Sequence, residues 1–277
     1  MTAETEHSIA ANGLQIYYRE SGHGQPLVLL HGGTATSGSW SAHLPTFAER
    51  FRVLAPDSRG HGKTDNPTGQ LSYQLMAHDV AAFIEALGLE KPLVLGYSDG
   101  GQIALELGIS YPELTAGLVV GAASYKFGPT YFQGLKSWGF DSAADVNGDT
   151  LQRTNPDYLN YLQSEHARPD DPDHWQTLLQ QIGQLWFSVT DYSEEQLHSI
   201  RTPTLLYLGD RDELNDIDQQ VEMYHHIAEA ELAIVPHADH FSAGEDMSNP
   251  PVLRFLERHT QVGTTTTPDS ATTSESK

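Results

Sequence analysis

The segment Gly96-Tyr97-Ser98-Asp99-Gly100-Gly101 decides the fold. It directly follows a short apolar run, Pro92–Leu95, and precedes a helical pattern over Gln102–Leu107. A sharp turn from a strand into a helix needs glycines on either side, because a Cβ atom there would collide with neighbouring backbone. Such a turn lifts the Ser98 hydroxyl above the sheet at a helix N-terminus, where developing negative charge is stabilised. The segment therefore predicts a nucleophilic serine, with an incidental serine in a glycine-rich turn as the alternative.

Short apolar runs alternate with helical patterns along most of the chain, which is typical of a mostly parallel sheet covered by helices. The first two runs flank Asn12-Gly13, a pair typical of a two-residue hairpin, so the sheet is expected to open with an antiparallel pair. The later runs are nearly continuous, as in strands buried on both faces. The predicted strands are 8–11, 14–20, 26–31, 51–57, 92–97, 117–122, 203–208 and 231–236, and the predicted helices are 73–87, 102–107, 218–228 and 252–259.

The alternation breaks between residues 124 and 200, where three of the four tryptophans lie without a convincing strand. A connection of this length without structure of its own is rare, so a helical cap inserted between two strands is predicted there. The core around the sheet is expected to comprise residues 1–123 and 201–262. Residues 263–277 are rich in Thr and Ser and contain no large apolar residue, which predicts a disordered tail.

The composition excludes several classes of function. The chain has 37 acidic and 15 basic residues, a net charge of −22, and no cysteine. This charge repels nucleic acid and anionic lipid, so neither is expected as a partner. The excess of acidic residues indicates a surface that keeps copies of the protein apart in solution, and adaptation to a salt-rich host is the alternative interpretation of the charge. Without cysteine there is no disulfide, thiolate metal site or cysteine nucleophile. No run approaches the roughly 18 apolar residues of a membrane helix, and residues 1–7 lack a secretion pattern, so a cytoplasmic location is expected.

Two further loops supply the base and the acid that a serine nucleophile needs. Pro236-His237-Ala238-Asp239-His240-Phe241 follows the last predicted strand; His240 is assigned as the base, with His237 as the alternative. Gly209-Asp210-Arg211-Asp212 follows the preceding strand, at the edge where open α/β sheets place their ligands. Asp212 is assigned as the acid that orients the base. Asp210 and a merely solvated loop are the alternatives.

A third loop, Leu29-Leu30-His31-Gly32-Gly33, ends an earlier apolar strand. Two glycines let a substrate oxygen approach the main chain, so the N–H groups of Gly33 and Asp99 are predicted to stabilise an oxyanion. A plain pair of turn glycines is the alternative for this loop. His31 is expected to form structural hydrogen bonds rather than to take part in catalysis.

The order Ser98, Asp212, His240, each after a strand, resembles the α/β-hydrolase fold family. The loop His31-Gly32-Gly33 and the turn Asp57-Ser58-Arg59-Gly60-His61-Gly62, which is similar to the family's D-x-R-G-x-G turn, belong to the same resemblance over roughly residues 8–260. It implies an eight-stranded sheet with an antiparallel second strand, a cap, and neither a metal nor an organic cofactor. Dehalogenases and epoxide hydrolases of this fold carry aspartate in the place of Ser98, so their reactions are disfavoured.

The turn around Ser98 also looks like the G-W-S-D-G-G turn of valacyclovirase-like hydrolases. The resemblance implies that Asp99, the acid after the nucleophile, holds a substrate ammonium group. Capping of the following helix by Asp99 is the alternative.

The predicted function is hydrolysis of a small carboxylic ester or lactone through an acyl-enzyme on Ser98. Hydrolysis of a C–C bond in a dienoate-like ketone, or of an aminoacyl ester held by Asp99, would use the same residues. Acyl transfer to an alcohol or peroxide and a ligand receptor with a hydrolase fold are further alternatives. Trp138 and Trp186 are candidates for the substrate pocket, as are Trp175, Tyr131 and Phe132, with packing in the core as the alternative. The oligomeric state is not readable.

Overall fold

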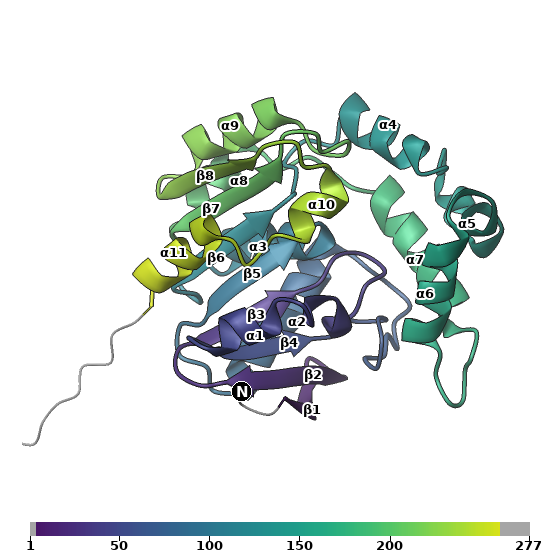
Figure 1. Cartoon of the computed structure of the whole chain (residues 1–277), viewed down its shortest axis with the longest axis horizontal. Helices are drawn as coiled ribbons and strands as arrows, with labels where there is room; N and C mark the ends of the chain where they lie inside the picture. Colours follow the sequence, from purple (N-terminus) through teal and green to yellow (C-terminus); the bar gives the residue numbers. More distant parts are fainter. Residues whose placement is uncertain (1–3, 261–277) are drawn as a thin grey trace, which may run out of the picture.

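The computed structural model describes residues 4–260, which are built around one eight-stranded sheet (Figure 1). The strand order is β1-β2-β4-β3-β5-β6-β7-β8; β2 is antiparallel to both of its neighbours, and all later pairs are parallel. The strands are β1 (Thr5–Ala11), β2 (Leu14–Gly22), β3 (Pro26–Leu30), β4 (Arg52–Pro56), β5 (Leu93–Tyr97), β6 (Gly117–Gly121), β7 (Thr204–Gly209) and β8 (Ala230–Val235). The predicted mostly parallel sheet with an antiparallel second strand is confirmed.

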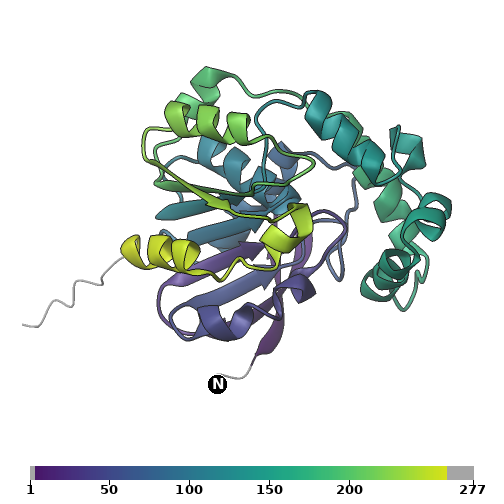
Figure 2. The same cartoon turned by 45° about the horizontal axis from the view of Figure 1, so that its top comes forward.

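The two faces of the sheet pack against different helices (Figure 2). Side chains alternate between the faces along each strand: in β3, Val28 and Leu30 join one hydrophobic cluster, whereas Leu27 and Leu29 join the other. The first cluster includes α2 (Tyr73–Ala86), α3 (Asp99–Ser110), α8 (Glu194–Ser199) and α9 (Ile217–His226), and the second includes η1 (Ser37–Trp40), α1 (Leu44–Ala48), α10 (His240–Gly244) and α11 (Pro250–Arg258).

Helix α3 begins at Asp99, earlier than the predicted start at Gln102. Gly100 and Gly101 form helices poorly, which conceals this first turn in the sequence pattern. A Cβ atom on Gly100 would lie 2.1 Å from the carbonyl oxygen that ends β3, and one on Gly101 would lie 2.1 Å from the carbonyl oxygen that ends β6. Close packing against the sheet therefore outweighs helix propensity.

Between β6 and β7 the chain forms a helical insertion, residues 122–203, most of which lies to one side of the sheet, whereas its last helix, α8, lies near α9 (Figure 1). No strand occurs within residues 122–203. The helices of the insertion are α4 (Pro129–Ser137), η2 (Ala143–Asp145), α5 (Gly148–Thr154), α6 (Pro156–His166), α7 (His174–Phe187) and α8. The assignment of residues 124–200 as a separate cap stays a prediction.

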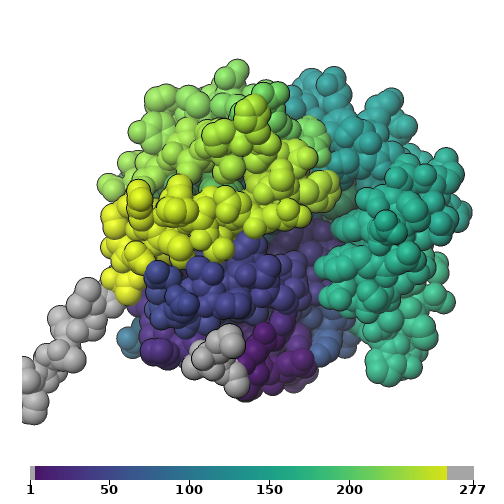
Figure 3. Space-filling model, viewed as in Figure 1, coloured from purple at the N-terminus to yellow at the C-terminus, as the bar shows by residue number. Residues whose placement is uncertain are grey.

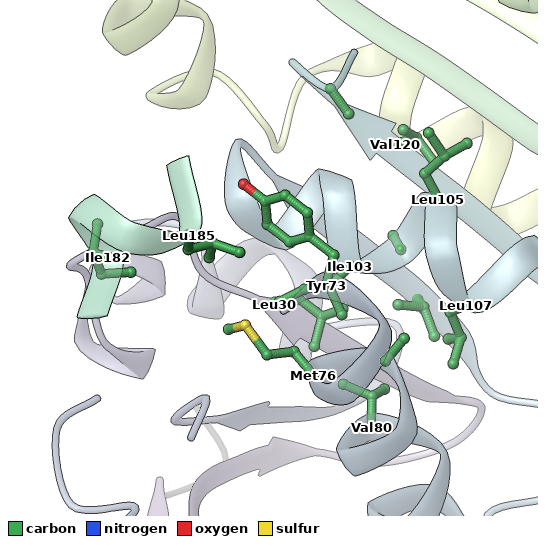
Figure 4. Packing of buried hydrophobic residues seen from close by; sticks show 14 of the residues in the cluster. Leu30, Tyr73, Met76, Val80, Ile103, Leu105, Leu107, Val120, Ile182 and Leu185 are labelled. Atoms are coloured by element: carbon green, nitrogen blue, oxygen red, sulfur yellow. The ribbon is translucent and has the colours of Figure 1, made fainter. Parts of the chain in front are cut away.

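The insertion shares a hydrophobic core with the sheet. Ile182 and Leu185 of α7 belong to the same buried cluster as Leu30 of β3 and Tyr73 and Met76 of α2 (Figure 4). In the space-filling view the insertion, coloured teal to green, lies against the remainder of the molecule (Figure 3). The insertion is therefore packed on the sheet and α2 by apolar side chains.

No helix within residues 4–260 is both long enough and apolar enough to cross a membrane. The predicted disordered tail, residues 263–277, lies outside the described residues.

Candidate active site

Ser98 lies at the turn from β5 into α3, where its backbone has a rare conformation. Its φ is 55° and its ψ is −122°, a strained combination that persists only when the surroundings enforce it. Ser98 N donates a hydrogen bond of 2.9 Å to the carbonyl of Gly121 in β6. A Cβ atom on Gly96 would lie 2.0 Å from the carbonyl oxygen of Gly100. The turn therefore has the glycine-flanked form that the sequence predicts.

Three polar side chains from separate segments meet at this turn. Ser98 Oγ lies 2.9 Å from His240 Nε2, and His240 Nδ1 lies 2.8 Å from Asp212 Oδ2. The side chains of His240 and Asp212 are 4% and 0% exposed, so little water competes for their hydrogen bond. We name Ser98, His240 and Asp212 the candidate triad. The structure brings together the three residues that the sequence selected.

The turn after β7 fixes the carboxylate of Asp212. Oδ1 accepts hydrogen bonds from the backbone N–H groups of Leu214 and Asn215, both at 2.9 Å, and from Asn215 Nδ2 at 3.1 Å. These donors hold one carboxylate oxygen and leave Oδ2 directed at His240. Asp212 therefore has the arrangement expected of a residue that orients an imidazole.

The alternatives from the sequence lie outside the candidate triad. Asp210 Oδ1 lies 3.6 Å from Arg211 Nε, and His237 is exposed. His31 Nε2 accepts a hydrogen bond from Ser58 N at 2.9 Å, and its Nδ1 donates to the main-chain carbonyl of the next residue at 2.8 Å. His31 thus forms structural hydrogen bonds, as expected.

Opposing influences act on the pKa of His240. Burial lowers it, but the charge of Asp212 and its hydrogen bond to the ring raise it, and the charges of Glu213 and Asp99 act in the same direction. The net result is a pKa above the ordinary value of 6.5. A ring in this environment is a stronger base, and its cation is stabilised by the adjacent carboxylate.

Helix α10, which the sequence patterns do not predict, begins at His240. Asp239 caps it: the carboxylate accepts a hydrogen bond from Ser242 N at 2.8 Å, and Ser242 Oγ accepts one from Asp239 N at 2.9 Å. These two bonds form a capping box, which fixes the start of a short helix. His240 therefore projects from a defined helix terminus rather than from an open loop.

Replacing Asp239 by alanine is expected to lower the free energy of unfolding by about 1 kcal/mol, because the cap of α10 is lost. Urea unfolding curves measure this change. Asp239→Asn is the matched control, since asparagine caps helices as well as aspartate does. Equal losses in the two variants would contradict the capping role.

Glu213 and Tyr97 support His240 and were not predicted. Tyr97 OH donates to the carbonyl of His240 at 2.7 Å, and His240 N donates to Glu213 Oε2 at 3.3 Å. Glu213 Oε1 also accepts a hydrogen bond of 3.0 Å from Trp138 Nε1 of the insertion. Glu213 directly follows Asp212 and Tyr97 directly precedes Ser98 in the sequence, but neither belongs to a pattern that reveals its partner.

Asp99 is buried beside the candidate triad and does not cap α3. Its Oδ1 accepts a hydrogen bond from Tyr73 OH at 2.9 Å, and its Oδ2 accepts one from Trp186 Nε1 at 3.0 Å. Burial raises the pKa of Asp99, and the two hydrogen bonds only partly offset this effect. The capping alternative is wrong, because the carboxylate instead connects α2 and α7 at the site.

A small cavity of about 30 Å³ adjoins Ser98 and His240. Both predicted pocket residues, Trp138 and Trp186, line the cavity. The centroid of the Trp138 ring lies 5.6 Å from that of the His240 ring and 6.3 Å from that of the Trp186 ring. Among the other aromatic candidates, Tyr131 also lines the cavity, whereas Trp175 is buried in the core and Phe132 is 39% exposed. The remaining lining residues are Tyr73, Asp99, Gln102, Ala122, Phe127, Leu135, Leu214 and Asn215.

The glycine loop after β3 lies against Ser98 and Asp99. A Cβ atom on Gly32 would lie 3.3 Å from Ser98 Cβ, and one on Gly33 would lie 2.4 Å from Asp99 Oδ2. The backbone N–H of Asp99 belongs to the first turn of α3, where amides have no acceptor within the helix. The two residues predicted as oxyanion donors thus flank the candidate nucleophile.

Four buried histidines, His31, His61, His166 and His174, lie in or against the loops after β3 and β4. The ring centroids of His31 and His61 are 5.0 Å apart, and those of His61 and His166 are 5.9 Å apart. Each ring has at least one nitrogen bonded to a main-chain group. Within residues 4–260, no cluster of three or more His, Asp or Glu side chains is arranged to hold a metal ion.

A family model described as alpha/beta hydrolase fold matches residues 25–246, so the chain belongs to this family. A 2-hydroxy-6-oxo-6-phenylhexa-2,4-dienoate hydrolase from Burkholderia cepacia is 26% identical over 265 residues, which cover 88% of this chain and 92% of the relative. A soluble epoxide hydrolase from Corynebacterium sp. (strain C12) is 31% identical over 164 residues, 59% of this chain and 56% of the relative. The solved structure of a meta-cleavage product hydrolase from Pseudomonas fluorescens IP01 aligns with a TM-score of 0.74 at 22% identity, covering 91% of this chain and 97% of that one. The family and these relatives support hydrolase activity.

Proposed function

We propose that the protein is a serine hydrolase that cleaves a small carboxylic ester or lactone through an acyl-enzyme on Ser98. The observation that carries this proposal is the pair of hydrogen bonds from Ser98 Oγ to His240 Nε2, 2.9 Å, and from His240 Nδ1 to Asp212 Oδ2, 2.8 Å. A serine hydroxyl is a poor nucleophile until a base accepts its proton, and this arrangement places a base within reach.

In the proposed reaction, His240 takes the Ser98 proton while Oγ attacks the substrate carbonyl. The N–H groups of Gly33 and Asp99 stabilise the resulting oxyanion, by about 3 kcal/mol for each donor. His240 then gives the proton to the departing alcohol as the acyl-enzyme forms. Water, deprotonated by the same ring, hydrolyses the acyl-enzyme and restores Ser98. Asp212 holds the ring with Nε2 free to accept the proton and stabilises the cation.

The residue at position 98 argues against epoxide hydrolysis, although an epoxide hydrolase is among the relatives. Epoxide hydrolases that resemble this fold use an aspartate in this place. A serine with a hydrogen-bonded histidine instead suits attack on a carbonyl carbon.

The charges around the cavity favour a neutral substrate over an anionic one. The lining residues include Asp99 but no Lys or Arg within residues 4–260, so a substrate carboxylate buried there would lack a partner. C–C hydrolysis of a dienoate-like ketone is nevertheless the second candidate, because relatives of that activity cover most of the chain. The cavity has room for about two water molecules, so side chains or helices of the insertion must move to admit either substrate.

Among ester substrates, the position of Asp99 supports an aminoacyl ester. Its carboxylate lines the cavity beside Ser98 and is buried, so a substrate ammonium group there would gain a partner of opposite charge. We further propose that small molecules are its partners in the cytoplasm, without nucleic acid or a membrane.

The test is a substrate panel on wild type and Ser98→Ala: p-nitrophenyl esters, lactones, an aminoacyl ester and a 2-hydroxy-6-oxo-dienoate. We expect wild type to hydrolyse esters or lactones with steady turnover, and Ser98→Ala to lose at least about 10³-fold in kcat. A fluorophosphonate should label wild type and not the variant. Rapid turnover of the dienoate with negligible ester hydrolysis would establish the second candidate instead. Labelling by the fluorophosphonate without steady turnover of any substrate would indicate a receptor. Formation of a new ester with an added alcohol would indicate acyl transfer.

A further inference from the structure

Thr34, which follows the predicted oxyanion donor Gly33, has a backbone conformation that its side chain disfavours. Its φ is 58°, in the left-handed region that β-branched residues rarely adopt. Such a conformation persists only where surrounding contacts enforce it. Because Thr34 is bonded directly to Gly33, the contacts that hold Thr34 also restrict the position of the Gly33 main chain, which carries the predicted donor N–H.

Side chains from two parts of the molecule hold Thr34. From the core, His61 Nε2 accepts a hydrogen bond from Thr34 N at 3.3 Å. From α6 of the insertion, His166 Nε2 bonds to the carbonyl of Thr34 at 2.8 Å, and Tyr158 OH bonds to Thr34 Oγ1. Thr34 Oγ1 donates its own proton to the carbonyl of Gly33 at 2.5 Å, so Tyr158 is the donor in the other bond.

The partners of His166 determine its tautomer. Nδ1 accepts a hydrogen bond from Gly62 N at 2.9 Å, so the proton is on Nε2, which donates to Thr34. The side chain has no exposed surface, and burial lowers the pKa of His166 to about 4. The ring is therefore neutral near pH 7 and connects the loop after β4 to the loop after β3.

We propose that His166, the last residue of α6, is a positioning residue that holds Thr34, and through it the Gly33 N–H, in place for the oxyanion. This inference rests on the proposed function and extends it, because it makes the insertion a part of the oxyanion site. Displacement of α6 would remove two of the bonds at Thr34 and relax its strained backbone. The loop would then lose the alignment that transition-state stabilisation requires.

Two substitutions separate the two hydrogen bonds of His166. In His166→Gln, the amide nitrogen reaches about the place of Nε2 and can still donate to Thr34, but the acceptor for Gly62 N is lost. In His166→Asn, the amide oxygen takes about the place of Nδ1 and can still accept from Gly62, but the donor to Thr34 is lost. Each variant thus removes one hydrogen bond, and only His166→Asn removes the bond to Thr34 that the proposal requires.

We expect His166→Asn to lower kcat for ester hydrolysis about tenfold with little change in KM, which is less than the 10²–10³ typical of deleting an oxyanion donor. His166→Gln should keep kcat within about threefold of wild type, a rescue by the variant that retains the donor. Tyr158→Phe, which removes the hydroxyl bonded to Thr34 Oγ1, should lower kcat by about threefold and serves as the second test if His166→Asn does not fold.

The matched control is the same pair of substitutions at His174 of α7. His174 is also buried, and its Nε2 donates to the carbonyl of Gly60 at 2.9 Å and not to Thr34. The kcat values of His174→Asn and His174→Gln should lie within about twofold of each other. Urea unfolding of every variant separates loss of stability from loss of turnover.

Two results would overturn the inference: equal losses of kcat in His166→Asn and His166→Gln, or a kcat unchanged from wild type in both His166→Asn and Tyr158→Phe. In either case, esterase activity of the wild type would leave the proposed function in place. An inactive wild type that fluorophosphonate does not label would overturn the proposed function and the inference with it. A selective loss in His166→Asn, without a matching difference in stability, supports the proposal.

Discussion

Asp212→Asn is expected to lower kcat by about 10³- to 10⁴-fold while the fold is retained. Asp212 Oδ2 accepts the hydrogen bond from His240 Nδ1, which leaves Nε2 without a proton and able to accept one from Ser98. An asparagine amide would donate to Nδ1 instead, so the proton of the ring would sit on Nε2 and face the serine. The remaining oxygen of the side chain can still accept the bonds from Leu214 and Asn215, so the turn after β7 should stay intact.

The measurement is kcat for a p-nitrophenyl ester together with thermal unfolding. The pKa that governs the acid limb of kcat/KM should also fall in the variant, because the charge of Asp212 raises the pKa of His240. Asp210→Asn is the matched control and should leave kcat near the wild-type value. Near wild-type turnover in Asp212→Asn would refute the assigned role.

Acid is expected to destabilise the protein between pH 6.5 and about pH 4 through the buried histidines. Burial lowers the pKa of His31, His61 and His166, in the last case from 6.5 to about 4, while Asp57 partly opposes this on His31 and His166. In this pH range the unfolded chain binds protons that the folded protein excludes, so the stability present above pH 6.5 is lost as the pH falls. His166 alone accounts for about 3 kcal/mol, and the other two rings add to it.

Urea unfolding at pH 7 and pH 4 measures this loss. Carboxylates also titrate over the range, so the comparison needs a variant that lacks only one histidine. His166→Gln should lose about 3 kcal/mol less than wild type between the two pH values, since glutamine does not titrate. If wild type and His166→Gln lose the same free energy, His166 is not held neutral in the folded protein.

The sequence predicts the sheet well because strands buried on both faces leave a local signature. Runs such as Pro92–Tyr97 are apolar throughout, and the structure places a fully buried strand there, Leu93–Tyr97. The hairpin at Asn12-Gly13 was also predictable, because both residues take the positive φ that this pair tolerates. Ser98, Asp212 and His240 could be selected because each follows such a strand, and parallel strands end at one edge of the sheet.

What escaped prediction depends on contacts between segments far apart in the chain. The role of Asp99 depends on Tyr73 and Trp186, and no local pattern connects these three positions. His166 and Thr34 likewise meet only because α6 packs over the loop after β3. Helix periodicity indicates which face of a segment is buried but does not identify the polar group that will oppose it.

The hydrophobic cluster that joins α7 to β3 and α2 has a consequence for engineering. Ile182 and Leu185 belong to the same buried cluster as Leu30 and Met76, so a protein trimmed of the insertion would expose part of this apolar cluster. Exposed surface of that kind promotes aggregation. An insertion taken from another hydrolase would thus have to preserve the apolar surface that packs on the sheet and α2. Altered selectivity is more readily obtained by replacing single side chains that line the cavity.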